Sequence, residues 1–304
     1  MNYKKIISSQ ELRFFILKTL SFISDKKMLN WQYRIKTGRK IDFKMPQRYT
    51  EKLQLYKMYY RNPILGKCVD KYHVREYVES KGLSNILNIL YGVYDDVSAI
   101  DFTKLPNEFV IKTTDGGGGE NILICTDKNK LDLPSVQKRL ISWKDKKNIN
   151  AGREWAYTQI DKSRYIVEQL LVNDINPKAG ISDFKIFCFN GNPFCIVYDV
   201  DRYIGHKRNF YDVDWNCLNV SSDCPNFPDN KCKPEGLDEL LNVAKVLSED
   251  FPFVRVDLYY LNHQVYFGEL TFYPWSGYVQ FTPDEFDFEL GRQFDISSFY
   301  PNVK

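Results

Sequence analysis

Residues 254–259, VRVDLY, and residues 266–271, YFGELT, decide the fold of this chain. Side chains of a β-strand alternate between its two faces, and both stretches are predicted to be strands, the two arms of one hairpin. Asp257 lies on the first arm and Glu269 on the second. A loop of three residues, 262–264, pairs Asp257 directly with Glu269, whereas a loop of two residues turns Glu269 to the opposite face of the sheet.

The shorter loop pairs Asp257 with Gly268, and we favour the three-residue loop because only it gives the polar residues one shared face. In the favoured register, Arg255 and Thr271 join the two acids on one shared face. Two carboxylates opposite each other on neighbouring strands repel unless a cation lies between them. Carboxylate oxygens suit a hard cation, and Mg²⁺ with phosphate groups completing its shell is the one we expect. The alternative is a solvated acid pair on an outer face of the sheet.

The composition is that of a globular chain. Of its 304 residues, 43% are hydrophobic and 15% aromatic, which is ample for a folded core and argues against disorder. The length predicts one large domain or two to three coupled subdomains. The net charge of +3 is small, so composition gives no reason to expect nucleic-acid binding, and a small anionic ligand fits equally well.

The cysteines and histidines argue against a zinc site. There are seven cysteines without a Cys-x-x-Cys pair, and three histidines. An odd number of cysteines without a signal peptide predicts a reduced, cytoplasmic protein. Residues 14–23 are apolar but too short to span a bilayer, and we favour a packed amphipathic helix over a helix on a membrane surface.

The remaining chain divides into a mainly helical first hundred residues and a region rich in strands. Helices are predicted at 51–60 and 70–79, and residues 84–90 form an apolar run. Asn190-Gly191 is the strongest hairpin signal in the chain. Further on, the predicted elements are strands at 109–112, 121–124, 165–171, 183–189 and 194–200, helices at 134–143 and 237–248, and a loop at 219–234.

A lysine and four glycines form the second candidate site. Lys112 ends a predicted strand, and Gly116, Gly117, Gly118 and Gly119 follow in the turn. The backbone amides of such a turn can wrap an anion closely, and the lysine adds charge for phosphate oxygens. No Gly-Lys-Ser/Thr follows, so this is not a Walker A loop, and a strand rather than a helix follows, so it is not a dinucleotide fingerprint. A flexible hairpin tip is the alternative.

Two further cations lie on or near the hairpin of residues 183–200. Lys185 is a lysine on an otherwise apolar strand, so it is either an edge-strand charge that blocks aggregation or a buried ligand contact. Arg202 could supply a guanidinium for charge that develops in a transition state. The alternative for Arg202 is a surface ion pair with a neighbouring acid.

Asp-Val-Asp occurs twice, at 199–201 and 212–214. This spacing is similar to the Asp-x-Asp metal motif of nucleotide-sugar glycosyltransferases, which keeps a second enzyme class open. A glycosyltransferase of that fold should place alternating strands and helices before the motif. The first hundred residues are predicted to be helical instead.

Taken together, these residues resemble the ATP-grasp signature in its usual order: Lys112 with its glycines, Glu168, Lys185, Arg255-x-Asp257 and Glu269-x-Thr271. More narrowly, the chain resembles the TupA-like ATP-grasp family of bacterial surface-polysaccharide loci, from about residue 30 to about residue 292. The stretches that carry the resemblance are DKYHVREY at 70–77, KLPNEFVIK at 104–112, GREW at 152–155, DFKIFCFNGNP at 183–193, RNFYDVDWN at 208–216, FPFVRVDLY at 251–259 and FGELTFYP at 267–274.

The resemblance implies an α+β ATP-grasp fold in three parts. These are a helical N-terminal region at 1–103, a small lid subdomain at 104–175, and a C-terminal subdomain built on an antiparallel sheet at 176–304. The last of these would bind the metal and the phosphates.

The resemblance also implies a role for each site residue. Lys112 and Lys185 would hold ATP phosphates, with the glycine turn closing over them. Glu168, Gln169 and Leu171 would belong to the hinge whose backbone meets the adenine. The remaining roles concern the hairpin and its neighbourhood: Asp257, Glu269 and Thr271 would hold Mg²⁺, and Arg202 or Arg255 would face an acyl phosphate. Thr271 departs from ATP-grasp enzymes at large, which commonly have asparagine there, a better metal ligand.

The function that follows is that of a cytoplasmic carboxylate–amine ligase using ATP and Mg²⁺. By resemblance, the carboxylate belongs to a uronic-acid sugar or an acidic chain of the cell surface, and the amine to an amino acid. Peripheral association with a membrane-bound polysaccharide assembly is a further expectation. A glycosyltransferase and a non-catalytic ATP-binding module remain the alternatives.

Overall fold

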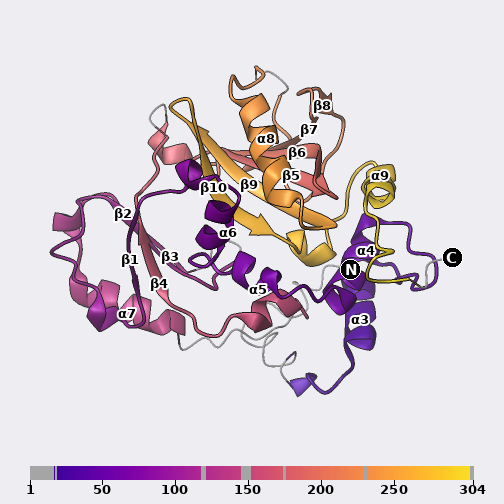
Figure 1. Cartoon of the computed structure of the whole chain (residues 1–304), viewed down its shortest axis with the longest axis horizontal. Coiled ribbons are helices and arrows are strands. Elements are labelled where there is room, and N and C mark those ends of the chain that lie inside the picture. The colour runs from indigo at the N-terminus through magenta and orange to yellow at the C-terminus, as the bar shows by residue number, and fades with distance from the viewer. Residues whose placement is uncertain are drawn as a thin grey trace.

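Two antiparallel sheets form the framework of this computed structural model (Figure 1). The structure describes residues 17, 19–117, 121–144, 152–173, 176–228 and 232–301. The first sheet has four strands and the second has six. The helices lie around them rather than alternating with parallel strands, so the fold class is α+β, as predicted.

The four-stranded sheet has the strand order β1-β4-β2-β3. It carries α7, which buries Val136, Leu140 and Trp143 at helical spacing against the sheet. Tyr165 of β4 donates a hydrogen bond from its hydroxyl to the carbonyl oxygen of Leu140, 2.8 Å away, so the helix is also tied to the sheet. The elements of this unit are β1 (Leu90–Tyr94), β2 (Phe109–Thr113), β3 (Ile122–Cys125), α7 (Leu133–Lys144) and β4 (Tyr165–Glu168).

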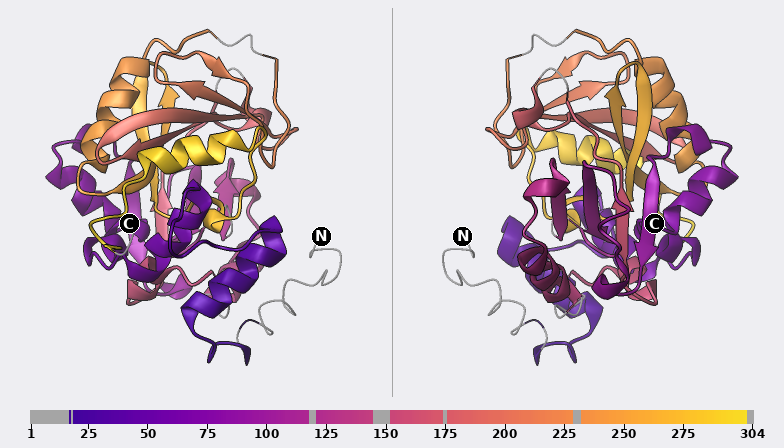
Figure 2. Two further views of the ribbon diagram at one scale, coloured as in Figure 1. Left: turned by 90° about the vertical axis from the view of Figure 1, so that its right-hand side faces the viewer. Right: turned by 90° about the vertical axis from the view of Figure 1, so that its left-hand side faces the viewer.

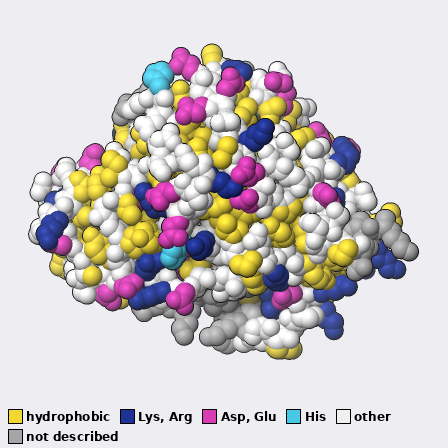
Figure 3. Space-filling model, viewed as in Figure 1, with side chains coloured by type: hydrophobic (Ala, Val, Ile, Leu, Met, Phe, Trp, Pro, Cys, Tyr) yellow, Lys and Arg dark blue, Asp and Glu magenta, His cyan; other side chains and the backbone are white. Residues whose placement is uncertain are grey.

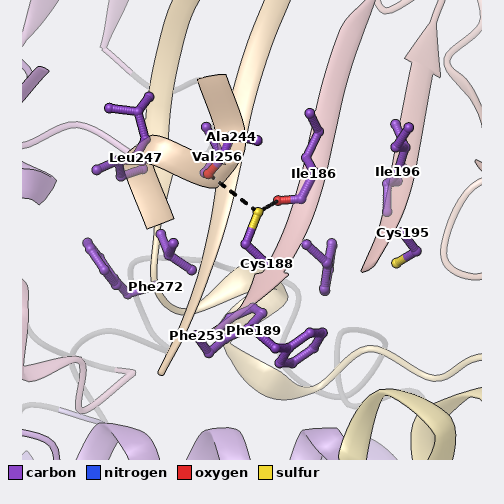
Figure 4. Close-up of a cluster of buried hydrophobic side chains, with 14 of the residues drawn as sticks. Ile186, Cys188, Phe189, Cys195, Ile196, Ala244, Leu247, Phe253, Val256 and Phe272 are labelled. Atoms are coloured by element: carbon purple, nitrogen blue, oxygen red, sulfur yellow. Dashed lines mark hydrogen bonds between the residues drawn. The ribbon is translucent and has the colours of Figure 1, made fainter. Parts of the chain in front are cut away.

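The six-stranded sheet has the strand order β10-β9-β5-β6-β7-β8, so β5 lies at its centre. One face is covered by α8, whose leucines at 237, 240 and 247 point toward the strands. Figure 4 shows the contact: Cys188 of β5 approaches the carbonyl oxygen of Ala244 in α8, with Sγ 3.8 Å away. The elements are β5 (Asp183–Phe189), β6 (Asn192–Val200), β7 (Lys207–Asp212), β8 (Cys217–Leu218), α8 (Leu237–Ser248), β9 (Phe253–Leu261) and β10 (Gln264–Thr271).

The N-terminal helices join this sheet through an aromatic core. Tyr49 at the start of α4 is fully buried, and its ring lies 5.2 Å from that of Phe253 and 6.2 Å from that of Phe294. α9 packs against α4 beside the sheet (Figure 2). The helices are α3 (Asp25–Thr37), α4 (Tyr49–Tyr59), α5 (Ile64–Val69), α6 (Val74–Ser80) and α9 (Glu285–Gln293).

The hairpin of β9 and β10 has a shorter loop than the predicted one. Gln264 pairs with Leu261, which leaves a two-residue turn of Asn262 and His263. Both turn residues have positive φ, 50° and 61°, as a type I′ turn requires. The predicted three-residue loop is therefore wrong.

The predicted pairing of Asp257 with Glu269 is nevertheless confirmed. The register shifts by one residue between Phe267 and Glu269, where Gly268 is the extra residue of a β-bulge. A Cβ on Gly268 would lie 2.8 Å from the carbonyl oxygen of Asp257, so this bulge needs glycine. The bulge cancels the effect of the short turn and returns Glu269 to the face of Asp257.

Most other predicted elements are present, with two corrections. The helices predicted at 51–60 and 70–79 correspond to α4 and α6, but residues 90–94 form β1 in the four-stranded sheet. The strand predicted at 165–171 ends at Glu168. β7 and α9 had no counterpart in the prediction. Of the apolar segment 14–23, residues 14–16 and 18 lie outside the described residues. Across the described ranges, no helix has both the length and the apolar character that crossing a membrane requires.

Candidate functional site

A pocket of about 700 Å³ lies where the two sheets face each other. The four-stranded sheet contributes Lys112 and Glu168, and the six-stranded sheet contributes strands β5, β9 and β10. The pocket gathers most of the predicted site residues that the structure describes: Lys112, Gly116, Gly117, Glu168, Leu171, Lys185, Arg202, Arg255, Asp257, Glu269 and Thr271. Gly118 and Gly119 lie outside the described residues.

Lys185 is a buried cation at the centre of the six-stranded sheet. Its strand, β5, has neighbours on both sides, so the role of an edge-strand charge is excluded. Its Nζ lies 2.8 Å from Asp183, 3.4 Å from Asp199 and 3.9 Å from Asp257, while only 4% of the residue is exposed. A lysine held among acids and facing a pocket is pre-oriented for an anionic ligand.

The acid pair of the hairpin is only partly solvated. Asp257 is 3% exposed and accepts two hydrogen bonds from Arg255, Nε to Oδ1 at 2.7 Å and Nη2 to Oδ2 at 2.6 Å. Glu269 has a side chain that is 42% exposed. The solvated-pair alternative is therefore wrong for Asp257.

Burial and nearby cations act in opposite directions on the two acids. Burial raises the pKa of Asp257 to about 6, although the Arg255 and Lys185 cations oppose this change. Burial acts in the same direction on Glu269, but Lys71, Arg255 and Lys185 outweigh it and lower the pKa of that carboxyl. At neutral pH both side chains are therefore carboxylates.

Thr271 connects the arginine to the exposed acid. Its hydroxyl accepts a hydrogen bond from Nη2 of Arg255 and donates one to Oε1 of Glu269, each 3.2 Å long. Among the described residues, the polar contacts of Glu269 fall on Oε1, which leaves Oε2 available. Thr271 thus orients Glu269.

The donor set fits a Mg²⁺ ion that arrives with phosphates. Within the described residues, no group of three or more His, Cys, Asp or Glu side chains could hold a metal ion by itself. Asp257 and Glu269 supply carboxylate oxygens from adjacent strands. Mg²⁺ commonly takes one or two carboxylates and completes its shell with water and phosphate oxygens.

The glycine turn is anchored next to the same pocket. Lys71, just before α6, donates from Nζ to the carbonyl oxygen of Gly116, and its backbone N–H donates to the carbonyl oxygen of Thr114 at 2.9 Å. The carboxylate of Asp115 accepts a hydrogen bond of 2.6 Å from the hydroxyl of Ser163, which directs this acid to the protein. A Cβ on Gly117 would meet nothing within 4 Å, so open space lies beside it.

The segment predicted as the adenine hinge enters the pocket only in part. Glu168 pairs with Nζ of Lys112 at 3.1 Å and with Arg75 at 3.4 Å. Gln169 does not line the pocket, and its backbone N–H and carbonyl are bonded to Ile89 and Asn88. Leu171 does line it.

Arg202 was predicted either to face the site or to form an ion pair with a neighbouring acid, and it does both. It lines the pocket, and its Nη2 also forms an ion pair with Asp183 at 3.1 Å, with 41% of the side chain exposed. A half-exposed arginine in this position can leave its partner and follow a ligand. Its partner Asp183 is shared with Lys185.

Several pocket residues were not predicted as functional. Lys71 and Glu154 lie within the stretches DKYHVREY and GREW, and Arg208 is the first residue of RNFYDVDWN. These stretches carried the family resemblance, but no role was predicted for the three residues. Arg208 binds both oxygens of Asp199, with Nε to Oδ1 at 2.6 Å and Nη2 to Oδ2 at 2.9 Å. Trp275 lies under Arg208 and Arg255, with its ring centre 5.0 and 5.8 Å from their guanidinium carbons.

Each of the two Asp-Val-Asp repeats has an acid that binds other groups of the protein. Asp199 is buried between Arg208 and Lys185, and these cations hold its pKa far below the usual range against the effect of burial. Asp212 caps a turn, because it accepts hydrogen bonds from the backbone N–H groups of Asp214 and Asn216. In each repeat, one acid is therefore held by contacts within the protein.

The outer surface adds no large single-sign patch on the face seen in Figure 3, where acidic and basic side chains are interspersed. Within the pocket, seven lysine or arginine side chains face six acidic ones. Charged side chains of both signs are therefore gathered in the pocket in nearly equal numbers.

The fold, two antiparallel sheets with a pocket of many charged residues between them, is ATP-grasp-like. The TupA-like ATPgrasp family matches residues 51–295, and the chain belongs to this family. The resemblance inferred from the motifs is thereby confirmed. Among curated proteins, none matches the chain.

Solved structures with a similar fold include three ligases or synthetases. D-alanine–D-alanine ligase from Bacillus anthracis has 17% identity and a TM-score of 0.40, over 67% of this chain and 57% of that chain. The ADP complex of PurK, N5-carboxyaminoimidazole ribonucleotide synthetase, has 13% identity and a TM-score of 0.42, over 67% of this chain and 45% of that chain. The ATP-grasp ligase PsnB, in complex with a phosphomimetic variant of its minimal precursor, Mg and ADP, has 12% identity and a TM-score of 0.38, over 70% of this chain and 53% of that chain. The chain spans about half the length of these structures.

Proposed function

We propose that this protein is an ATP-dependent carboxylate–amine ligase that works through an acyl phosphate. The observation that carries the proposal is the pocket itself. It brings Lys112 from one sheet and Lys185, Arg255, Asp257 and Glu269 from the other to a single cavity, although they are far apart in the sequence. Family membership supports the same reaction class.

The chain's own residues position and neutralise the reacting groups. When bound, ATP supplies the phosphoryl group and Mg²⁺ offsets its charge. Lys112 and Lys185 hold phosphate oxygens, and the amides near Gly116 and Gly117 approach them closely because no side chain intervenes. Asp257 and Glu269 hold the metal, and Thr271 orients the second of them.

The arginines act on the carboxylate that is activated. Arg255 is fixed by Asp257 and stacked near Trp275, so its guanidinium is already oriented toward charge that develops on the acyl group. Arg202 is half exposed and follows the substrate carboxylate as it enters. Such positioning and charge neutralisation account for most of the catalysis of phosphoryl transfer.

The substrates that we propose are an acidic sugar chain, or its precursor, and an amino acid. The near balance of cations and acids in the pocket favours an anion that brings its own cation, as Mg·ATP does. The acidic chain would be a polysaccharide of the cell surface, and the protein would work beside a membrane-bound assembly. The identity of the two substrates and the membrane-bound assembly rest on the family alone.

The experiment is an ADP-release screen over pairs of sugar acids and amino acids. We expect turnover that requires ATP, a carboxylate and an amine together, and that falls strongly in Glu269→Gln. Glu289→Gln, an exposed acid on α9, is the matched control and should keep wild-type turnover. Consumption of a nucleotide sugar without ATP would contradict the proposal in favour of a glycosyltransferase. ATP binding without turnover for any pair would favour a non-catalytic module.

A further inference from the structure

A lysine with no access to solvent lies directly behind the pocket wall. Lys57 of α4 is fully buried, and its Nζ donates to the carbonyl oxygen and the hydroxyl of Ser276, at 2.6 and 2.8 Å. The nearest carboxylate, Glu154, is 3.7 Å away. Burying a lysine is costly, and one carboxylate beyond hydrogen-bond distance offsets little of that cost.

The turn that presents Ser276 has an unusual backbone. Trp275, Ser276 and Gly277 have consecutive positive φ values of 49°, 55° and 70°. Such conformations are strained in residues other than glycine, and they persist only where the surroundings impose them. Here α4 imposes them, because Gln54 donates to the carbonyls of Ser276 and Gly277 at 3.2 and 2.9 Å, and Lys57 binds Ser276.

Glu154 and Ser276 complete a chain of polar groups that reaches the pocket. Both residues line the pocket, and the hydroxyl of Ser276 donates to Oε1 of Glu154. Gly152 keeps this corner open, because a Cβ there would lie 2.8 Å from the Glu154 carboxylate and 3.0 Å from the Ser276 hydroxyl. The chain therefore runs from Lys57 through Ser276 to Glu154 and the cavity.

The surroundings of Lys57 favour its uncharged form. Burial lowers its pKa to about 7, Glu154 opposes this change, and Lys36 of α3 adds to it. The ring of Tyr278 is a further neighbour, with its centre 4.7 Å from Nζ. An uncharged amine has a lone pair and can accept a proton, which the arginines of the pocket cannot do.

We propose that Glu154, Ser276 and Lys57 form the site that receives and deprotonates the amine co-substrate. The inference rests on the ligase function proposed above. Glu154 and Ser276 bind the ammonium group that enters the pocket. One N–H bond of that group breaks and its electron pair stays on nitrogen. The proton goes to Oγ of Ser276, whose own hydroxyl proton turns from Glu154 to Lys57 and moves to the lone pair of Nζ. The free amine then attacks the acyl carbon and the C–N bond forms. Phosphate leaves with the C–O electron pair, and the second N–H proton of the attacking nitrogen leaves on that phosphate oxygen.

The test compares two nucleophiles on the same activated carboxylate. An amino acid is an ammonium ion at neutral pH and needs a base, whereas hydroxylamine is largely uncharged and does not. With the carboxylate that supports ADP release, Lys57→Met should lower amide formation about 100-fold, as expected for loss of a general base. Hydroxamate formation should be unchanged, and amide formation should regain rate as the pH is raised.

A control variant, Lys52→Met, and a second variant, Glu154→Gln, complete the test. Lys52 of α4 also anchors backbone carbonyls, those of Gly291 and Phe294, so Lys52→Met controls for loss of a half-buried lysine of the same helix and should keep both rates. Glu154→Gln, at a partly exposed side chain, should raise the KM for the amine and spare the hydroxamate reaction.

Equal loss of amide and hydroxamate in Lys57→Met, or loss of neither, would overturn this inference and leave the ligase function standing. Formation of neither product by the wild-type protein with any carboxylate would instead remove the ligase function itself.

Discussion

At the scale of single residues, Thr271 takes the position where an amide would be a stronger metal ligand. Its hydroxyl bridges Arg255 and Glu269, so its contribution is to fix the orientation of an acid. Residues that orient metal ligands commonly change metal affinity about 10- to 100-fold when they are replaced.

Thr271→Val keeps the shape of the side chain and removes both hydrogen bonds. We expect the Mg²⁺ concentration for half-maximal ATP turnover to rise about tenfold or more. A magnesium titration at saturating ATP measures it. Thr103→Val, at an exposed hydroxyl bonded to Asp101, serves as the control. An unchanged magnesium requirement in Thr271→Val would show that Glu269 is oriented by other contacts.

Lys57 makes stability depend on pH in a direction that the structure fixes. Its folded-state pKa of about 7 lies below the value of the unfolded chain, so the unfolded state binds more protons between these values. The free energy of unfolding should therefore rise with pH from about 7 toward 10, by at most about 1.4 kcal/mol per unit. The slope should be absent in Lys57→Met. Denaturant unfolding of both proteins at several pH values measures it, and parallel curves would refute the prediction.

At the scale of elements, the hairpin of β9 and β10 depends on one glycine. Gly268 forms the bulge that sets Asp257 against Glu269 after a two-residue turn. The acid pair therefore depends on a backbone irregularity as much as on its own side chains.

Gly268→Ala should break this register, because its Cβ would lie 2.8 Å from a backbone oxygen that cannot move freely. We expect a loss of about 1–3 kcal/mol in unfolding free energy together with loss of ATP turnover. Gly38→Ala, at the end of α3 with φ of 78° and nothing near its Cβ, should lose stability alone. Retained turnover in Gly268→Ala, with stability equal to wild type, would mean that the bulge does not set the site.

At the scale of the whole molecule, the secondary structure was easier to predict from the sequence than the tertiary arrangement. Strands with strong alternation and turn signals, such as the hairpin around Asn190-Gly191, were predictable because the information is local. The Asp257–Glu269 pair was predicted correctly from an incorrect loop, since nothing in the alternation reveals a compensating bulge. Lys57 could not be recognised, because a lysine in a helical pattern is usually solvated, and its burial depends on a turn 219 residues away.

The same limit applies to the composition of the pocket. Lys112 and Lys185 were predicted because a glycine run and an apolar strand mark them locally. Lys71, Glu154 and Arg208 lie in stretches that carry the family resemblance, but no local pattern gave them a role, and they reach the cavity only when the helices and the two sheets come together. The catalytic account therefore depends on the assembled fold and is best tested in the whole chain.

The central claim is that this pocket transfers a phosphoryl group to a carboxylate. The most direct measurement uses the carboxylate found in the screen, labelled with ¹⁸O in its carboxyl group, and follows the released phosphate by mass spectrometry. Attack of the carboxylate on ATP and later departure of phosphate carry one labelled oxygen into that phosphate. We predict singly labelled phosphate in amounts equal to the amide formed. Unlabelled phosphate, with ADP released at the same rate, would contradict the account.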